Sequence, residues 1–299
     1  MAAELLTPRD GFLGIGEDDA SAPADAPKAV IIPFGLEKTV SFGTGTGRGP
    51  QAIIEASHQV ELFDDELWCE PSGSFHVDTL REPAIPEGMD DALALLADLT
   101  GSALDDGAFP LTLGGEHSIT PGALRPFLRK WPDLALLHFD AHADLRDGYE
   151  GEPYSHAAAI RRCMDAPDLE VVSIGIRNIS AGEIPFVEAN RHRLHIHWAR
   201  DMRSWTIAEM LAPLEGRPIY ITFDLDGFDA SLMPATGTPE PGGLFWADVM
   251  PILRRACEIG QVVGADINEL APVDALHGCD FLAAKLVHRL LAMIFAQRA

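Results

Sequence analysis

Short apolar runs of β-strand length recur along this chain. They cover Val30–Phe34, Phe109–Leu113, Leu134–Phe139, Val171–Ile176, Arg193–Trp198, Ile219–Phe223 and Val262–Ile267. Between them, apolar residues recur with the period of an amphipathic helix. These stretches are Pro50–Val60, Asp90–Leu99, Thr120–Leu128, Ile207–Leu214, Asp248–Ile259 and Phe281–Phe295.

The alternation of strands and helices predicts the fold class. Parallel strands need crossover connections, and helical crossovers cover both faces of the sheet. We therefore expect an α/β fold of three layers, with a doubly wound parallel sheet in the middle. After Pro27 no linker interrupts the alternation, so residues 28–299 are predicted to form one domain.

The first 27 residues differ from the rest of the chain. They are rich in Ala, Asp, Pro and Gly and show no sustained hydrophobic period. This composition is typical of a poorly packed arm or of an interface segment. We expect an N-terminal arm over residues 1–27.

The charge of the chain excludes some classes of partner. With 46 Asp and Glu against 22 Lys and Arg, the formal net charge is -24. A nucleic-acid binder needs a basic surface that displaces counterions from phosphates, so neither nucleic acid nor an anionic membrane surface is an expected partner. The excess of carboxylates would attract metal ions or a cationic metabolite, although it also serves solubility.

The two ends of the chain and its cysteines indicate a cytoplasmic protein. Residues 1–19 lack the basic start and apolar run of a signal peptide, and Lys285, His288 and Arg289 interrupt the apolar stretch near the C-terminus. The four cysteines are widely spaced and form no Cys-x-x-Cys pair. We expect them to be reduced and structural.

Side chains of the metal-ligand type follow two of the predicted strands. In an open α/β sheet, ligands gather beyond the carboxyl ends of the strands. His117 follows the second apolar run, while Asp140, His142 and Asp144 alternate after the third. A spacing of two places side chains on one side of an extended backbone. Carboxylates and an imidazole converging there would repel and desolvate each other without a cation.

Two more carboxylates, Asp224 and Asp226, follow the strand Ile219–Phe223. The complete set has two imidazoles, four carboxylates and no thiolate, which suits Mn²⁺ better than a structural zinc site. Six ligands are too many for one ion with an open position, but two bridged ions would use all of them. Taken one at a time, these motifs could also be polar loops or a hydrogen-bonded structural histidine. His138, His195, His197 and His288 are expected to be structural.

The sequence resembles the ureohydrolase family, which includes arginase and agmatinase, over nearly the whole chain after the arm. The matching segments are Gly-Gly-Glu-His-Ser at 114–118, Phe-Asp-Ala-His-Ala-Asp at 139–144, Ser155-His156, Phe-Asp-Leu-Asp-Gly-Phe-Asp at 223–229 and Asp-Ile-Asn-Glu-Leu-Ala-Pro at 266–272. The resemblance implies an arginase-like fold, a catalytic domain over residues 28–299, two Mn²⁺ ions and a homo-oligomer, either a trimer or a hexamer.

The resemblance also implies which residues act. One manganese ion would be held by His117, Asp140, Asp144 and Asp224, and the other by His142, Asp140, Asp224 and Asp226. A hydroxide that bridges the ions, oriented by Asp144, would attack the guanidinium carbon. His156 matches a histidine that protonates the departing amine, although it could be an ordinary loop histidine. Glu269 matches a glutamate that pairs with the guanidinium group.

The loop between Asp144 and His156 bears on the choice of substrate. It carries Asp147, Glu150 and Glu152 against a single arginine, and an acidic rim favours a cationic substrate over a zwitterion. Residues 40–46, 150–156 and 237–243 also resemble agmatinases, so we expect conversion of agmatine to putrescine and urea. The alternatives are another guanidino compound, as in guanidinobutyrases and arginases, or a non-catalytic relative that binds polyamines or metal.

Overall fold

The computed structural model describes residues 4–16 and 22–296. Within these residues, eight parallel strands form one sheet in the order β2-β1-β3-β8-β7-β4-β5-β6. The strands are β1 (Lys28–Phe34), β2 (His76–Thr79), β3 (Phe109–Gly114), β4 (Ala135–Phe139), β5 (Glu170–Ile176), β6 (Leu194–Trp198), β7 (Pro218–Asp224) and β8 (Gln261–Asn268).

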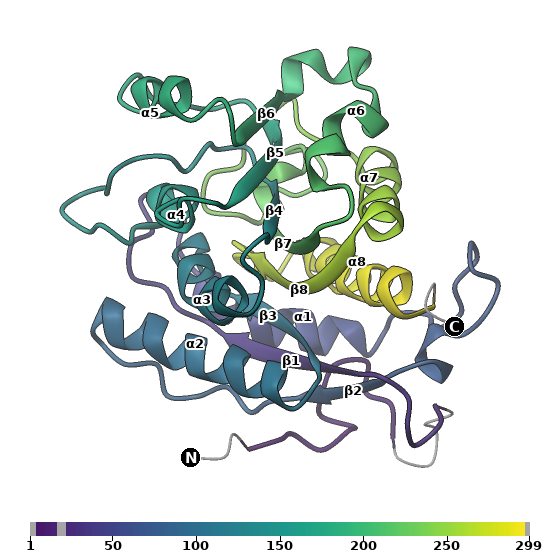
Figure 1. Cartoon of the computed structure of the whole chain (residues 1–299). Helices are drawn as coiled ribbons and strands as arrows, with labels where there is room; N and C mark the ends of the chain where they lie inside the picture. The colour runs from purple at the N-terminus through teal and green to yellow at the C-terminus, as the bar shows by residue number, and fades with distance from the viewer. Residues whose placement is uncertain (1–3, 17–21, 297–299) are drawn as a thin grey trace.

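Helices cover both faces of this sheet. They are α1 (Gly49–Ser57), α2 (Met89–Asp105), α3 (Thr120–Lys130), α4 (Ala159–Cys163), α5 (Ile184–Ala189), α6 (Ile207–Leu211), α7 (Trp246–Ile259) and α8 (His277–Ala296). In Figure 1, α2 to α5 lie on one side of the sheet, while α6, α7 and α8 lie on the other, where α1 packs against α8. The predicted three-layer, doubly wound α/β fold is confirmed.

Each predicted apolar run forms a strand, but one strand was not predicted. β2 lies at the edge of the sheet and has only His-Val-Asp-Thr as its sequence. An edge strand that is only partly covered needs few apolar residues, so its sequence lacks the expected signal. The helices α4 and α5 were missed for a related reason, since each has too few turns to show a helical period.

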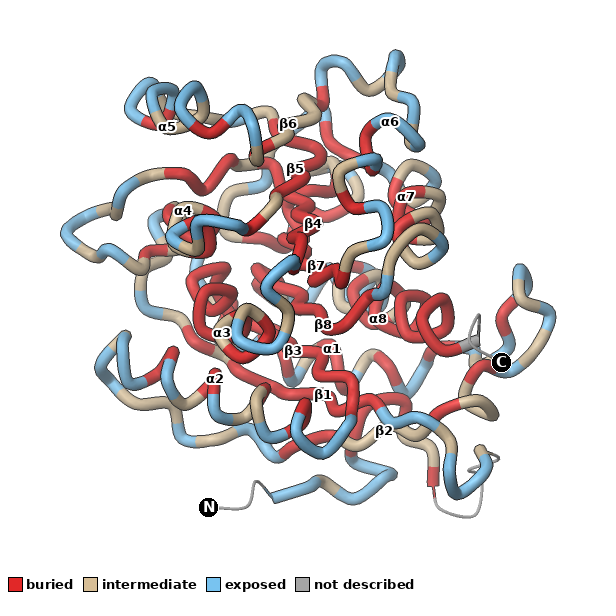
Figure 2. The backbone as a smooth tube through the Cα atoms, in the orientation of Figure 1, coloured by how far each residue is buried: buried red, intermediate tan, exposed pale blue. Residues whose placement is uncertain are grey.

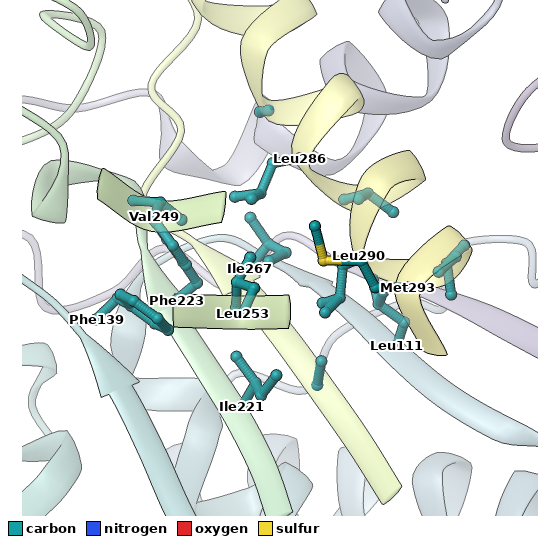
Figure 3. Close-up of a cluster of buried hydrophobic side chains, with 14 of the residues drawn as sticks. Leu111, Phe139, Ile221, Phe223, Val249, Leu253, Ile267, Leu286, Leu290 and Met293 are labelled. Atoms are coloured by element: carbon teal, nitrogen blue, oxygen red, sulfur yellow. The ribbon is translucent and has the colours of Figure 1, made fainter. Parts of the chain in front are cut away.

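Two apolar cores, one on each face, fix the central strands. β3, β4 and β7 are buried along their whole length, which appears as red segments in Figure 2. Figure 3 shows the core between the sheet and the helices α7 and α8, where Phe223, Leu253 and Leu290 pack together. On the opposite face, Phe127 and Tyr220 belong to the core beneath α2, α3 and α4. The central strands therefore present their carboxyl ends from a rigid base.

The described part of the N-terminal arm packs against the edge of the sheet. Leu5 forms an antiparallel bridge with Leu80, and the backbone N–H of Phe12 donates to the Thr79 hydroxyl. The side chains of Phe12 and Leu13 are buried in the core. Residues 4–16 are thus held against the domain, whereas residues 1–3 and 17–21 of the predicted arm lie outside the described residues.

The helix α8 contains charged and titratable groups although most of it is buried. No helix of the described residues is long and apolar enough to span a membrane. Arg289 forms ion pairs with Asp64 and Glu66. His288 is completely buried, and neither ring nitrogen has a hydrogen-bond partner among the described residues. Burial, together with the nearby charge of Lys285, lowers the pKa of His288 to about 4.

We predict that His288 makes the protein less stable in acid. Because the folded state holds the ring neutral while the unfolded chain binds a proton below pH 6.5, stability is lost as the pH falls from there toward 4. Between pH 7.5 and pH 5 this loss is about 2 kcal/mol. His288→Leu should remove it, whereas His192→Leu, at an exposed position, should not. Urea unfolding at both pH values measures the difference, and equal losses for all three proteins would contradict the prediction.

Candidate functional site

The candidate side chains come from four neighbouring strands in the middle of the sheet. In the order β3-β8-β7-β4 these strands point their carboxyl ends toward the same edge (Figure 1). They supply His117 after β3, Glu269 after β8, Asp224 and Asp226 at and after β7, and Asp140, His142 and Asp144 after β4. The structure thus brings together residues that are up to 152 positions apart in the chain.

The first group of ligand-type atoms surrounds one ring nitrogen of His117. Its Nδ1 lies 3.2 Å from Asp140 Oδ2, 3.2 Å from Asp144 Oδ2 and 3.4 Å from Asp224 Oδ2. Burial lowers the pKa of His117, but hydrogen bonding to these carboxylates outweighs burial and holds the pKa well above its ordinary value. The ring therefore retains a proton at neutral pH unless another cation takes its place.

The other ring nitrogen of His117 determines which nitrogen carries the proton in the neutral ring. Nε2 lies 2.8 Å from the hydroxyl of Thr222, which donates its own proton to Asp266 at 2.6 Å. Nε2 must therefore be the donor in the first bond, and in the neutral ring Nδ1 offers only a lone pair. In the neutral ring this buried lone pair faces three carboxylates and receives no hydrogen bond from the described residues. Such an arrangement fits a divalent cation, whose binding would release the ring proton.

The second group of ligand-type atoms surrounds His142. Its Nδ1 lies 3.0 Å from Asp226 Oδ2 and 3.6 Å from Asp140 Oδ1. Burial lowers the pKa of His142, but the charges of Asp226 and Asp140 raise it to about 12. Asp140, His142 and Asp226 lie close enough together to hold a metal ion. Because Asp140 uses one oxygen toward each histidine, it joins the two groups.

Electrostatic repulsion among the buried carboxylates also favours a cation. Burial, together with the charge of Asp140, raises the pKa of Asp144 to about 7. Burial and the charges of Asp226 and Asp140 raise the pKa of Asp224 well above its ordinary value. These groups resist ionisation only while no positive charge lies between them, since a bound metal ion would stabilise every carboxylate in its ionised form.

His138 contacts the candidate ligand Asp140 from within the core. It is completely buried on β4, its Nε2 lies 2.9 Å from Asp140 Oδ2, and its Nδ1 lies 3.0 Å from Ser173 Oγ. His138, His117 and Asp140 are also near enough to hold an ion. However, His138 does not line the pocket described below, and its two hydrogen bonds fit the structural role expected from the sequence.

Two of the acidic residues that line the pocket adopt an unusual backbone conformation. Asp144 has φ 53° and Glu269 has φ 69°, in the left-handed region that L-residues rarely adopt. Both residues line the pocket described below. Strained positions of this kind persist where the surrounding structure fixes them, and they cluster at functional sites.

A pocket opens above the two groups of ligands. Its floor contains His142, Asp144, Asp224, Asp226 and Glu269, and its wall contains Val40–Gly43, Arg146, Tyr149, His156, residues 178–180, Glu183, Gly237 and Thr238. Glu269 Oε1 accepts the backbone N–H of His117 at 2.7 Å, and the other oxygen lies near Gly237. The candidate catalytic residues therefore share one pocket with four of the six candidate ligands, while His117 and Asp140 are buried and do not line it.

His156 enters this pocket from a loop after β4. Its Nδ1 lies 3.1 Å from the hydroxyl of Thr39, and its Nε2 lies 3.5 Å from that of Ser41. Burial lowers the pKa of His156, and the positive charges of His142 and His117 lower it further, against the opposing effect of Glu116. A neutral imidazole at the pocket wall is able to exchange protons with a bound molecule near neutral pH.

The structure places the three acidic loop residues outside the pocket lining. The carboxylate of Asp147 is exposed and pairs with Arg162 at 2.6 Å, which lowers its pKa. Glu152 accepts the backbone N–H of Tyr154 at 2.9 Å. Glu150 is exposed on the loop. The side chains from this loop that do reach the pocket wall are those of Arg146 and Tyr149.

Several wall residues were not identified from the sequence. Residues 178–180 follow β5, so the rule that ligands gather at strand ends could have indicated them. Glu183 accepts hydrogen bonds from the backbone N–H groups of Leu145 and Ser180 and thereby joins two loops of the wall. Arg177 donates to the carbonyl oxygens of Gly175, Asp226, Gly227, Phe228 and Glu240. No pattern in the sequence predicts these contacts.

Comparison with known proteins agrees with the fold and the site. Residues 27–293 match the model of the arginase family. The chain is 35% identical over 279 residues to the N(1)-aminopropylagmatine ureohydrolase of Synechocystis sp., covering 90% of this chain and 89% of that protein. It is 35% identical over 267 residues to the agmatinase of Bacillus anthracis, covering 88% of this chain and 91% of that one.

A solved structure of a relative has the same fold. The agmatine ureohydrolase of Thermoplasma volcanium superposes with a TM-score of 0.78 at 29% identity and covers 92% of both chains. A family match over most of the chain, relatives above 30% identity and a shared fold all agree with the convergence of acidic and histidine side chains at the strand ends. This chain belongs to the arginase family and is a ureohydrolase close to the agmatinases and related guanidino hydrolases.

Proposed function

We propose that this enzyme hydrolyses the guanidinium group of agmatine to putrescine and urea, with two Mn²⁺ ions as its cofactor. The observation that carries the proposal is the position of the buried Asp140, which has one oxygen near His117 and the other near His142. It lies beside the carboxylates that line the pocket. We further propose that the protein is cytoplasmic, and that it forms a homo-oligomer, a trimer or hexamer, as the family resemblance implies.

The proposed ligands divide into two overlapping sets. One ion would be held by His117, Asp140, Asp144 and Asp224, and the other by His142, Asp140, Asp224 and Asp226. When bound, the two ions would balance the buried negative charge and make a water molecule beside them a stronger acid and hence a better nucleophile. Oxygen-rich ligands with imidazole and no thiolate support manganese over zinc.

The remaining roles belong to side chains of this chain. Glu269 has one oxygen fixed by the backbone of His117, which leaves the other to accept an N–H of the guanidinium group and hold its carbon in place. Asp144 would accept a hydrogen bond from the attacking water. His156, at the pocket wall, would give a proton to the amine as it departs.

Agmatine is supported by the charges around the pocket. Two acidic residues of its lining, Glu183 and Glu269, are not among the proposed metal ligands, and they stand against the single arginine Arg146. Because Asp147, Glu150 and Glu152 lie outside the lining, we propose that they attract a cationic substrate from a distance rather than touch it. N(1)-aminopropylagmatine is the second candidate, since the relative that acts on it is as similar as the agmatinase.

The first prediction from this proposal concerns metal content. Active protein should contain two Mn²⁺ ions per chain, because six ligand side chains around one ion would leave no open position. Asp140→Asn should weaken the binding of both ions, whereas Asp226→Asn should mainly weaken one. Elemental analysis of each protein after dialysis measures this. One ion per chain in fully active protein would contradict it.

The second prediction is that Glu269→Gln lowers kcat/KM for agmatine by about tenfold or more. The substitution keeps the shape of the side chain and removes a charged hydrogen bond worth roughly 1.5–3 kcal/mol. Manganese content should not change, because Glu269 is not among the proposed ligands. Glu258→Gln, an exposed position on α7, is the control. Equal kinetics for the variant and the wild type would remove Glu269 from substrate binding.

The third prediction is a preference for agmatine over L-arginine by about a hundredfold in kcat/KM. An α-carboxylate that is buried beside acidic side chains without a partner costs several kcal/mol, and roughly 2.7 kcal/mol gives this ratio. Urea release should be measured for agmatine, N(1)-aminopropylagmatine, 4-guanidinobutyrate and arginine at one pH with saturating Mn²⁺. Comparable values for agmatine and arginine would disprove the substrate but not the hydrolysis.

A further inference from the structure

Glu116, in the Gly-Gly-Glu-His-Ser motif, has no role in the chemistry described so far. Its side chain is completely buried and accepts four hydrogen bonds. The backbone N–H groups of Lys38 and Thr39 donate to Oε2 at 2.8 and 2.6 Å. The hydroxyls of Thr39 and Ser118 donate to Oε1 at 2.9 and 2.6 Å. A buried carboxylate with this many donors acts only as an acceptor.

The hydroxyl of Thr39 connects Glu116 to His156. A hydroxyl has one proton, and Thr39 gives that proton to Glu116. Its oxygen must therefore accept in its other two contacts, which join it to the backbone N of His156 at 3.0 Å and to His156 Nδ1 at 3.1 Å. It follows that Nδ1 of His156 carries a proton, so Nε2 is the nitrogen with a free lone pair in the neutral ring.

We propose that Glu116 and Thr39 are positioning residues that fix the tautomer and orientation of His156, so that Nε2 alone takes up the proton that the attacking water loses and gives it to the departing amine. Nδ1 keeps its proton throughout. The proposal rests on the proposed hydrolysis, in which His156 is the proton donor. The charge of Glu116, transmitted by the Thr39 hydroxyl, stabilises the ring when both nitrogens are protonated, as a carboxylate behind a catalytic histidine does.

The same contacts also shape the pocket, so the test must separate chemistry from folding. Glu116 holds the backbone of the loop after β1 through Lys38 and Thr39, and its replacement would disturb that loop. The Thr39 hydroxyl can be removed with less damage. Thr39→Val keeps the shape of the side chain and the backbone N–H that Glu116 accepts, whereas Thr39→Ser keeps the hydroxyl.

The kinetic test compares these two variants with Thr44→Val. Thr44 is an exposed residue of the same loop and makes no side-chain hydrogen bond to another described residue. With agmatine and saturating Mn²⁺, Thr39→Val should lower kcat by about tenfold or more while KM stays within about twofold, since orienting a general acid affects the chemical step. Thr39→Ser should restore most of kcat, and Thr44→Val should behave as the wild type.

A second measurement reads the tautomer without any assay of activity. The protein is labelled with ¹⁵N-histidine and loaded with diamagnetic Zn²⁺, and the His156 signals are identified by their loss in His156→Gln. The wild type should carry its proton on Nδ1, and Thr39→Val should lose this preference.

A wild-type proton on Nε2, or an unchanged kcat in Thr39→Val, would overturn the proposal. Wild-type protein that releases no urea from any guanidino compound would defeat the proposed hydrolysis, while the ring signals would still decide the tautomer.

Discussion

The mutual repulsion of buried carboxylates is the constraint on which this site depends. Asp140, Asp144, Asp224 and Asp226 converge at the ends of adjacent strands, where burial removes the water that would otherwise solvate them. Two histidines supply partial compensation, and one of them has a buried nitrogen that receives no hydrogen bond from the described residues when the ring is neutral. The apolar cores on both faces of the sheet are what hold so many like charges in place, and a cation is what makes the arrangement favourable.

The parts of the site that lie on strand ends could be predicted from the sequence. Parallel strands all finish at one edge of the sheet, so any ligand-type residue just after a strand must lie near the others. Asp140, Asp144 and Asp224 follow this rule directly. The fold was predictable for a similar reason, because strands buried on both faces, such as β4 and β7, need continuous apolar sequences.

The parts of the site that lie on loops could not be predicted in this way. The path of the loop after β1 depends on Glu37, which accepts the backbone N–H groups of Gly45 and Gly47, and on Glu116, which is distant in sequence. Likewise, nothing near Asp147 in the sequence shows that its charge is taken up by Arg162. Local patterns give the composition of a loop, but long-range hydrogen bonds decide which of its side chains face the substrate.

The left-handed backbone at Asp144 and Glu269 has a consequence for how this protein can evolve. Each conformation costs on the order of 1 kcal/mol or more, which glycine would avoid. Selection for heat resistance alone should therefore favour glycine at both positions and would remove two carboxylates from the pocket as it does so. A thermostable descendant that keeps both carboxylates must acquire its added stability elsewhere, in the arm, the outer helices or the surface. Asp144 and Glu269 would then retain their strained backbone conformation.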